Sequence, residues 1–480
     1  MKYETVIGLE IHIQLSTRTK MFCSCPVPPE DAIPNTYVCP VCLGMPGTLP
    51  VPNEEAVNYA LMLAAALGCR VNRKSIFARK NYFYPDLPKG YQITQDEIPI
   101  AEEGKLTIET PDGGKKDIRI RRIHLEEDAG KSFHTMGFEN YTLVDFNRCG
   151  VPLIEIVSYP DISSPEEAAA YVRAMRQLVT YLGICAGDME KGNLRVDANV
   201  SVRPAGQTQL GKRTEIKNLN SFRFLQKALE YEVNRHIQIL ESGGEVVTET
   251  LLWNEREERT YAMRTKEESS DYRYFPEPDL LPLVVSEEQI ERAKSMVGEL
   301  PAERIARFER DYSLEHDVAV QLCARKDISD YADKVLTSVE DKKGAANWIL
   351  TELARILNER NWKISQFPVP PENLADLLKK LEQGKISRPI AKDLFRKMVD
   401  TQKTAEELIK EMGIQVISDR ASLESVVDQV IAENPDAVEK FKKGKTNIVG
   451  FFVGQVMKKT RGQADPKVVN QIVLEKLKTS

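Results

Sequence analysis

Four of the eight cysteines fall within a span of twenty residues, as the close pairs Cys23-Ser-Cys25 and Cys39-Pro-Val-Cys42. Zinc prefers four thiolate ligands in a tetrahedron, and two pairs joined by a loop supply them with little strain in the chain. We therefore expect zinc at Cys23, Cys25, Cys39 and Cys42, in a structural role, because four protein ligands leave no open position for water. The alternative is a loop that carries four reduced cysteines and no metal.

Polar groups gather on one face of a predicted strand near the N-terminus. In residues 5–15 every odd position from Ile7 onward is apolar. Successive side chains of a strand point to opposite faces, so Glu10, His12 and Gln14 share the polar face. The same alternation predicts two further polar faces, His124 with Glu126 and Asp128, and Arg195 with Asp197, Asn199, Ser201 and Arg203.

One carboxylate, Glu155, suggests that these polar faces form a binding site and are not only exposed to solvent. Glu155 stands alone in the apolar run Val151-Pro-Leu-Ile-Glu-Ile-Val157, where an isolated charge is costly unless it is paired or bound to a metal. Carboxylates and an imidazole from several strands could hold one or two Mg²⁺ ions, since magnesium prefers oxygen ligands. The alternation leaves two interpretations open, a shared metal site and the ordinary solvent faces of antiparallel strands.

Residues 77–92 interleave Phe and Tyr with Arg and Lys. Aromatic rings can stack on bases while neighbouring cations meet phosphate, so this segment is a candidate for binding a nucleotide or RNA. A core of Tyr and Phe edged by lysines whose charged ends reach water has the same composition.

The common phosphate-binding and nucleophile motifs are missing. The sequence contains no Gly-x-x-x-x-Gly-Lys-Ser/Thr loop, no Gly-x-Gly-x-x-Gly turn opening a βαβ unit and no Gly-x-Ser-x-Gly elbow. Any phosphate binding must therefore use another scaffold. No cysteine has the surroundings of a glutaminase nucleophile, so if nitrogen comes from an amide donor, another chain must release it.

Two kinds of sequence meet near residues 276–282. Before them, β-branched and aromatic runs alternate with Pro and Gly, which is typical of strands, and a few helices such as residues 165–182 interrupt them. After them, apolar residues recur at i, i+3 and i+4, which is typical of helices. We expect an α+β protein with an N-terminal domain rich in antiparallel sheet, then an all-helical region and a small helical tail domain.

Charge and hydropathy restrict the class of protein further. The 480 residues carry 66 Lys and Arg against 72 Asp and Glu, so any contact with RNA must be local. Residues 440–480 hold ten Lys or Arg against two acids. This excess indicates a basic patch that could bind RNA, although a solvated lysine face is the commoner meaning of such a run. No apolar run approaches the ~18–20 residues of a membrane span and no signal pattern is present, so we expect a cytoplasmic protein without membrane contact.

Six motifs are dense enough to compare with known families. They are Gly8-Leu-Glu-Ile-His-Ile-Gln-Leu15, Arg79-Lys-Asn-Tyr-Phe-Tyr-Pro-Asp-Leu-Pro-Lys-Gly-Tyr-Gln92, His124-Leu-Glu-Glu-Asp-Ala-Gly130, Asp145-Phe-Asn-Arg-Cys-Gly-Val-Pro-Leu-Ile-Glu-Ile-Val157, Thr214-Glu-Ile-Lys-Asn-Leu-Asn-Ser221 and Asn447-Ile-Val-Gly-Phe-Phe-Val-Gly-Gln-Val-Met-Lys-Lys459. Together they closely resemble the B subunits of bacterial tRNA-dependent amidotransferases, and the resemblance spans the whole chain.

The resemblance implies one part of a three-subunit enzyme that corrects misacylated tRNA. The B subunit would use ATP to phosphorylate the side-chain carboxylate of Glu-tRNA(Gln) or Asp-tRNA(Asn). Ammonia from the amidase A subunit would then displace the phosphate, and a small C subunit would hold the two large ones together. The resemblance also implies a cradle-shaped domain at residues 1–282 with a zinc-binding insertion at 23–42, a helical domain at 283–412, and a basic tail domain at 413–480 that contacts tRNA.

Matched residue by residue, the motifs imply the following metal and phosphoryl-transfer site: Glu10, His12, Glu126 and Glu155. They imply the following nucleotide and acceptor pocket: Lys80, Tyr82, Asp197, Asn199 and Ser201. The implied cofactors are ATP, Mg²⁺ and a structural Zn²⁺. A competing hypothesis is a non-catalytic, zinc-containing tRNA-binding module that presents aminoacyl ends to a partner enzyme. The acidic set argues against it, because carboxylates repel the phosphates of RNA unless Mg²⁺ lies among them.

Overall fold

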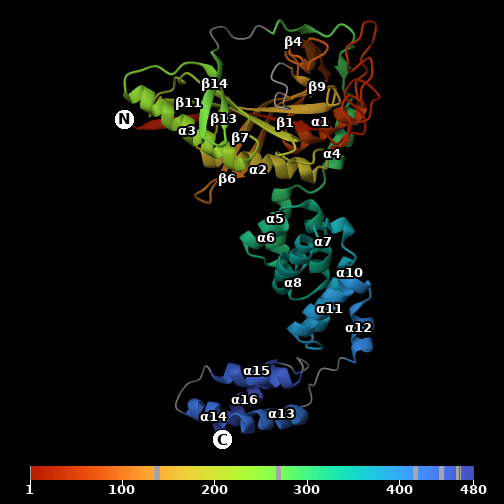
Figure 1. Cartoon of the computed structure of the whole chain (residues 1–480), viewed down its shortest axis with the longest axis vertical. Helices are drawn as coiled ribbons and strands as arrows, with labels where there is room; N and C mark the ends of the chain where they lie inside the picture. Colours follow the sequence, from red (N-terminus) through yellow and green to blue (C-terminus); the bar gives the residue numbers. More distant parts are fainter. Residues whose placement is uncertain are drawn as a thin grey trace. The chain divides into compact units, whose positions relative to one another are not determined.

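The computed structural model describes residues 2–133, 141–265, 272–413, 420–442, 448–460, 464 and 466–479. The chain divides into two compact units, Met1–Leu300 and Pro301–Ser480. The first unit contains a large, mostly antiparallel sheet and the second is helical (Figure 1), which confirms the α+β class expected from the sequence. Within the described residues, no helix has both the length and the apolar character to cross a membrane.

A nine-stranded sheet is the frame of the first unit. Its order is β14-β13-β12-β11-β1-β10-β7-β6-β2, and all neighbours are antiparallel except β12 and β13. The strands are β1 (Tyr3–Gln14), β2 (Arg70–Val71), β6 (Ala101–Glu109), β7 (Lys115–Glu127), β10 (Pro152–Ser158), β11 (Leu194–Pro204), β12 (Thr214–Lys217), β13 (Glu249–Asn254) and β14 (Arg259–Thr265). The central strand is β1, so its polar side chains lie between those of β10 and β11.

Shorter strands form three small sheets, β15-β4-β5, β16-β3 and β8-β9. Their bounds are β3 (Lys74–Ser75), β4 (Phe77–Asn81), β5 (Tyr91–Gln95), β8 (Lys131–Phe133), β9 (Leu143–Asp145), β15 (Phe275–Pro276) and β16 (Leu283–Val284). The aromatic and basic segment, residues 77–92, runs from β4 into the start of β5, and β15 pairs with β4 from almost two hundred residues further along the chain.

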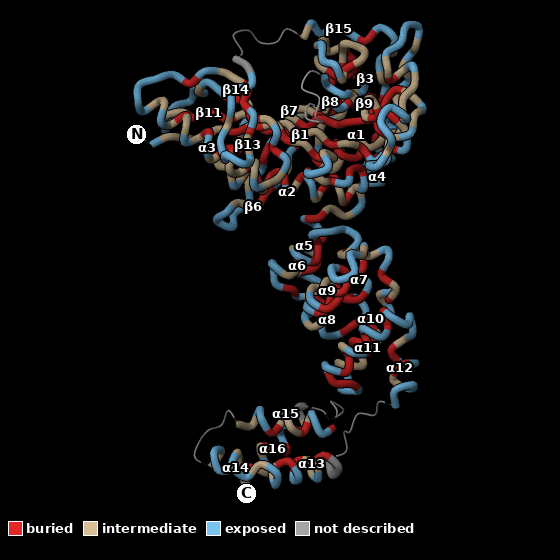
Figure 2. Tube along the Cα trace, viewed as in Figure 1, coloured by how far each residue is buried: buried red, intermediate tan, exposed pale blue. Residues whose placement is uncertain are grey.

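Three helices cover one face of the large sheet, namely α1 (Glu54–Ala66), α2 (Pro165–Tyr181) and α3 (Phe222–Glu241). Helix α2 begins where the sequence predicts, because the Ser164 hydroxyl accepts the Glu167 backbone N–H at 3.2 Å. The apolar residues of β1 are buried (Figure 2) and belong to the first hydrophobic core. Its polar side chains alternate with them and therefore project to the opposite face of the sheet. The face without helices is therefore free to carry a polar site.

The first unit extends beyond residue 282. Helix α4 (Glu287–Val297) packs against α1, and its Ile290 and Ala293 belong to the first hydrophobic core. For this reason the compact unit ends at Leu300. The division into domains at 282 and 412 stays a prediction.

The second unit contains two separate hydrophobic cores, one built from residues 308–408 and the other from residues 423–477. Its α-helices are α5 (Pro301–Tyr312), α6 (His316–Leu322), α7 (Lys326–Ser338), α8 (Lys342–Trp348), α9 (Ala354–Glu359), α10 (Pro371–Glu382), α11 (Arg388–Thr401), α12 (Ala405–Met412), α13 (Arg420–Glu433), α14 (Pro435–Lys442), α15 (Val449–Lys459) and α16 (Pro466–Thr479). The start of the expected tail domain, residues 414–419, lies outside the described residues.

A buried polar network fixes strand β12 to helix α3. Glu232 and His236, both fully buried on α3, lie 3.2 and 3.1 Å from the Thr214 hydroxyl of β12. Glu232 also accepts hydrogen bonds from Thr260 of β14 at 2.5 Å and from Arg235 at 2.8 Å. Burial opposes ionisation of Glu232, but hydrogen bonds from His236, Arg235 and Thr260 outweigh it and lower its pKa to about 2.

Replacing Glu232 with Gln should make the stability of the chain less sensitive to acid. The pKa of Glu232 lies below its ordinary value of 4.5, so the stabilisation is present above pH 4.5 and is lost as pH falls toward 2. We expect a loss of about 3 kcal/mol at pH 7 and a smaller loss at pH 3.5, measured by urea unfolding. The exposed Glu241 is the matched control, for which Gln should change stability by no more than about 0.5 kcal/mol. An equal loss at both pH values would contradict the account.

Candidate active site

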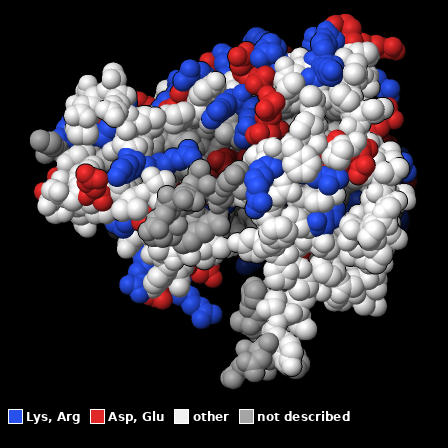
Figure 3. Space-filling view, turned by 90° about the horizontal axis from the view of Figure 1, so that it is seen from above, with Lys and Arg blue, Asp and Glu red and all other residues white. Residues whose placement is uncertain are grey.

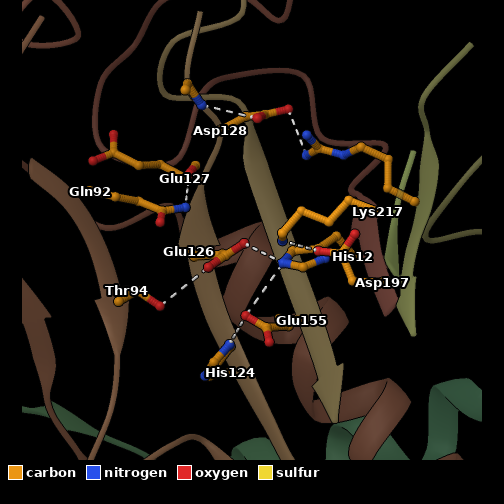
Figure 4. Close-up of polar contacts among 12 residues, drawn as sticks. His12, Gln92, Thr94, His124, Glu126, Glu127, Asp128, Glu155, Asp197 and Lys217 are labelled. Carbon is orange, nitrogen blue, oxygen red and sulfur yellow. Dashed lines mark hydrogen bonds and ion pairs between the residues drawn. The ribbon is translucent and has the colours of Figure 1, made fainter. Parts of the chain in front are cut away.

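The polar face of the sheet aligns side chains from three neighbouring strands (Figure 4). His12 of β1 is directly opposite Glu155 of β10, and Glu155 is directly opposite His124 of β7. Directly opposite residues of antiparallel strands project to the same face with their Cβ atoms about 5 Å apart. Register therefore accounts for the pairing of Glu155, which alternation within one strand does not.

His12, Glu126 and Glu155 form a compact set of possible metal ligands. His12 Nε2 lies 3.4 Å from Glu155 Oε2 and 3.5 Å from Glu126 Oε1. The three donor atoms all lie within 4.8 Å of one another, and both carboxylates are buried. His124 Nε2 is 2.6 Å from Glu155 Oε2, so it orients this carboxylate from the side opposite His12.

The two buried carboxylates of this set favour a positive charge beside them, either on His12 or on a bound cation. Burial alone would lower the pKa of His12, but Glu155 and Glu126 raise it to about 9. Burial likewise opposes ionisation of Glu155, yet His124 and His12 hold its pKa well below 4.5. A divalent cation bound here would supply the same positive charge and take His12 as a neutral ligand. One imidazole and two carboxylates thus fit a Mg²⁺ or Mn²⁺ site.

A second carboxylate cluster lies on the β11 side of His12. Donor atoms of Glu10, Asp197 and Glu215 come within 4.8 Å of one another, because Glu10 is directly opposite Asp197 in the register of β1 and β11. Lys217 Nζ lies 2.7 Å from Asp197 Oδ2 and 3.0 Å from Glu215 Oε1. Burial, Glu155 and Glu215 raise the pKa of Glu10, and the Asn199 amide donates to its Oε1 at 3.2 Å.

Strand β4 contributes a cation beside the carboxylates, and Tyr82 and Tyr272 from the segments next to β4 and β15 contribute aromatic rings. Lys80 Nζ is 4.9 Å from the centre of the Tyr272 ring, and Tyr82 packs edge-on against Tyr272 at 6.2 Å. Burial opposes the charge of Lys80, but Tyr274, Glu126 and Glu155 raise its pKa, so its ammonium lies within electrostatic reach of the histidine–carboxylate set. In the space-filling view (Figure 3), acidic atoms lie in a recess with Lys and Arg side chains beside it.

The four clustered cysteines converge as the sequence predicts. Their sulfur atoms all lie within 4.8 Å of one another, and Cys39 Sγ is 3.9 Å from Cys42 Sγ. Zinc–sulfur bonds of about 2.3 Å in a tetrahedron place sulfur atoms about 3.8 Å apart, so the geometry fits zinc. A hydrogen bond from Cys23 is the main reason that the pKa of Cys42 is lowered, to about 4. The cluster borders a cavity of about 200 Å³ that is also lined by Lys89, Tyr91 and Glu127.

Comparison with known proteins shows the family to which the chain belongs. The model of the GatB/GatE catalytic domain matches residues 5–291, and that of the GatB domain matches residues 330–477. The B subunit of the aspartyl/glutamyl-tRNA(Asn/Gln) amidotransferase of Thermodesulfovibrio yellowstonii is 50% identical over 478 residues, which cover 100% of both chains. The corresponding B subunits of Thermotoga sp. (strain RQ2) and Chlorobium phaeobacteroides are also 50% identical, over 98% and 99% of this chain and 98% and 100% of their own.

The chain belongs to the family of B subunits of aspartyl/glutamyl-tRNA(Asn/Gln) amidotransferases. This confirms the resemblance that its motifs suggest, and it makes the chain part of an enzyme of the aminoacyl-tRNA amidotransferase class.

The structure groups the residues that the family motifs imply in three places. His12, Glu126 and Glu155 come together, whereas the donor atoms of Glu10 lie with those of the Asp197 cluster. Asn199 contacts Glu10, and Ser201 lies buried two residues further along β11. Lys80 lies on β4, and Tyr82 directly follows this strand, with its ring centre 6.0 Å from Lys80 Nζ. The catalytic roles of all these residues stay predictions.

Sequence reasoning gave no role to three residues that this site brings together. His124 lies on a predicted polar face, but its contact with Glu155 depends on the register of β7 and β10. Glu215 and Lys217 lie on β12, a strand of four residues and thus too short for alternation to be recognised. The signal that pointed to these two was the motif around them, since they fall inside Thr214–Ser221.

Acidic residues of α13 neutralise part of the basic tail. Lys459 Nζ lies 2.5 Å from Glu433 Oε1, and Lys476 Nζ lies 2.8 Å from Asp428 Oδ2. The excess of positive charge in residues 440–480 is therefore smaller on the folded helices than in the sequence. Lys440 and Lys458 are exposed on α14 and α15, where they can meet phosphate.

Proposed function

We propose that this chain uses ATP to phosphorylate the side-chain carboxylate of Glu-tRNA(Gln) or Asp-tRNA(Asn), and that ammonia from a partner amidase subunit then displaces the phosphate. The observation that supports this proposal best is the set formed by His12, Glu126 and Glu155, with the cations Lys80 and Lys217 nearby. Metal ligands beside lysine ammonium groups are what a phosphoryl-transfer site requires.

The chemistry explains why ATP is needed. A carboxylate is a poor acyl donor, and phosphorylation turns one of its oxygens into a leaving group. His12, Glu126 and Glu155 would hold Mg²⁺, which when bound neutralises charge on the transferred phosphoryl group. Lys80 and Lys217 would bind the phosphate oxygens and the substrate carboxylate from either side. ATP is thus proposed as co-substrate and Mg²⁺ as the catalytic metal.

The proposed intermediate also explains the need for partner subunits. An acyl phosphate is hydrolysed in open water, so it must be enclosed, and ammonia must reach it without passing through solvent. The sequence contains no recognisable glutaminase nucleophile. We therefore propose a heterotrimer with an amidase A subunit and a small C subunit, in which the basic tail of this chain binds tRNA.

The reconstituted heterotrimer tests this function when ammonium chloride replaces glutamine. Misacylated tRNA should be amidated in the presence of ATP and Mg²⁺, and omission of either should abolish the reaction. A non-catalytic tRNA-binding module predicts instead that the ATP-dependent step belongs to a partner subunit, so that amidation continues in a Glu155→Gln heterotrimer that still binds tRNA. The buried, ionised Glu155 disfavours that module, because it has no use for a desolvated negative charge beside bound RNA.

We also propose that Cys23, Cys25, Cys39 and Cys42 bind one structural zinc ion. Elemental analysis of the chain purified without chelators should give about one zinc per chain, and Cys39→Ser should remove more than half of it. Cys69 lies outside the cluster and is the matched control, for which Ser should leave zinc content unchanged. A parent chain with little zinc, and no further loss in Cys39→Ser, would rule out the site.

A further inference from the structure

Lys20 lies beside the cysteine cluster and is fully buried. Its ammonium donates to the backbone carbonyl of Tyr37 at 2.7 Å and to Cys42 Sγ at 3.6 Å. Both acceptors belong to the cysteine-bearing loop. A lysine is almost never buried completely unless its charge is paired, so this position calls for an anion.

No carboxylate supplies that anion. Among the described residues, none forms an ion pair with Lys20, and its ammonium has no further hydrogen-bond partner. Glu127 lies near the Lys20 side chain, since a Cβ on Gly150 would be 3.5 Å from Lys20 Cδ and 3.8 Å from Glu127 Oε2, but Glu127 accepts from Lys89 and from the Ile93 backbone instead. Within the described part of the chain, the groups in contact with Lys20 that can carry negative charge are therefore the cysteine sulfurs, first of all Cys42.

The position of Lys20 is fixed from two sides. Asn53, which caps helix α1, donates its amide to the Lys20 carbonyl at 3.2 Å, and the Lys20 N–H donates to the Cys25 carbonyl at 2.9 Å. Gly150, whose φ of +82° favours glycine, lies beside both side chains, since a Cβ there would be in ordinary contact with Lys20 Cδ at 3.5 Å and with Cys42 Cβ at 3.4 Å. The ammonium is thus held against Cys42 before any metal binds.

We propose that Lys20 is a positioning residue for zinc, which holds the Cys42 sulfur by a hydrogen bond and cancels half of the negative charge of a zinc tetrathiolate. Zn²⁺ with four thiolates carries a charge of −2, and the adjacent ammonium reduces it to −1. The Cys39 backbone N–H, 3.2 Å from Cys42 Sγ, supports the same sulfur. Such outer partners of metal ligands typically change metal affinity by about 10–100-fold. This inference rests on the proposed zinc site.

The test measures zinc release and a spectrum, with the full chain. We expect the rate of zinc transfer to an excess of the chromogenic chelator 4-(2-pyridylazo)resorcinol to rise about 10–100-fold in Lys20→Met. In chains loaded with Co²⁺, the sulfur-to-cobalt charge-transfer band should shift, because Cys42 loses a hydrogen bond and a neighbouring cation. Lys191 is the matched control, since it pairs with Glu30 of the same loop while exposed. Lys191→Met should leave rate and band unchanged.

Lys20→Gln separates charge from hydrogen bonding, because an amide still donates to Cys42 but carries no charge. The rate of zinc release from Lys20→Gln should lie between the rates of the parent chain and of Lys20→Met. Unchanged release and spectra in both Lys20 variants, in chains with full zinc, would overturn this inference and leave the zinc site standing. A parent chain without zinc would overturn both. If a Lys20 variant unfolds, rescue of its circular dichroism by excess zinc supports the proposal, and failure of rescue contradicts it.

Discussion

ATP-dependent amidation should fall at least about a hundredfold when His12 is replaced by Ala or Glu155 by Gln. Each change removes a ligand or a charge from the proposed phosphoryl-transfer site, and losing one charge-stabilising group in such a site costs about 3–4 kcal/mol. We propose that glutamine hydrolysis takes place in a partner amidase, so its basal rate should persist. The measurement is a split assay of amidation, basal glutaminase and tRNA affinity on each variant heterotrimer.

Two exposed residues supply matched controls. His316→Ala removes a histidine of the second unit, and Glu103→Gln removes a carboxylate that pairs with Arg70 on the surface. Surface substitutions usually change stability by no more than about 0.5 kcal/mol, so both variants should stay folded. Because neither residue belongs to the proposed site, the amidation rate should stay within about twofold of the parent rate. Amidation near the parent rate in His12→Ala would show that the site is misplaced. A variant that loses tRNA affinity together with amidation would instead indicate that the fold of the first unit has been damaged.

Removal of the basic tail should weaken tRNA binding and its dependence on salt. The core of residues 423–477 is separate from that of residues 308–408, so deleting residues 413–480 removes one hydrophobic cluster without opening the other. Each lost phosphate contact lowers the slope of log K against log salt by about one, and we expect a decrease of at least about two. Binding should be measured between about 50 and 200 mM salt, where such contacts have their largest effect.

A variant that removes charge but keeps the helices distinguishes lost phosphate contacts from a lost tail fold. Lys440→Gln with Lys458→Gln removes two exposed cations and leaves the helices in place. It should lower the salt slope by about two at most, while amidation at saturating tRNA keeps the parent rate. Unchanged affinity and slope in both the deletion and the double variant would show that the tail lysines are only a solvated face.

The fold class and half of the site follow from local pattern. Alternation in β1 gave the buried and polar faces correctly, because a central strand with one covered face needs a strict two-residue period. Glu155 was found for a different reason, since a single carboxylate in an apolar run has few explanations other than a partner or a metal. The cysteine pairs converge because their spacing already permits a tetrahedron.

The remainder of the site depends on pairing between distant strands. Glu10 is directly opposite Asp197, nearly two hundred residues away, and this register separates it from the ligands around His12. His124 reaches Glu155 for the same reason. Lys20 gave no signal in the sequence, because a lysine between polar and apolar neighbours looks the same whether it is buried or exposed; its burial follows from how the loop folds over it. Helix α4 likewise joins the first core only through its packing against α1.

The most direct test of a phosphorylating site omits every source of nitrogen. The purified heterotrimer receives γ-labelled ATP, Mg²⁺ and either misacylated or correctly charged tRNA, with neither glutamine nor ammonia, and acyl phosphate is trapped with hydroxylamine. In a parallel reaction without hydroxylamine, we predict label on misacylated tRNA alone. With hydroxylamine, we predict a hydroxamate at the side-chain carboxylate and release of the label as inorganic phosphate, and His12→Ala should lose all three signals. Amidation that proceeds normally once glutamine is added, in an enzyme that never transfers label to the aminoacyl group, would contradict the account.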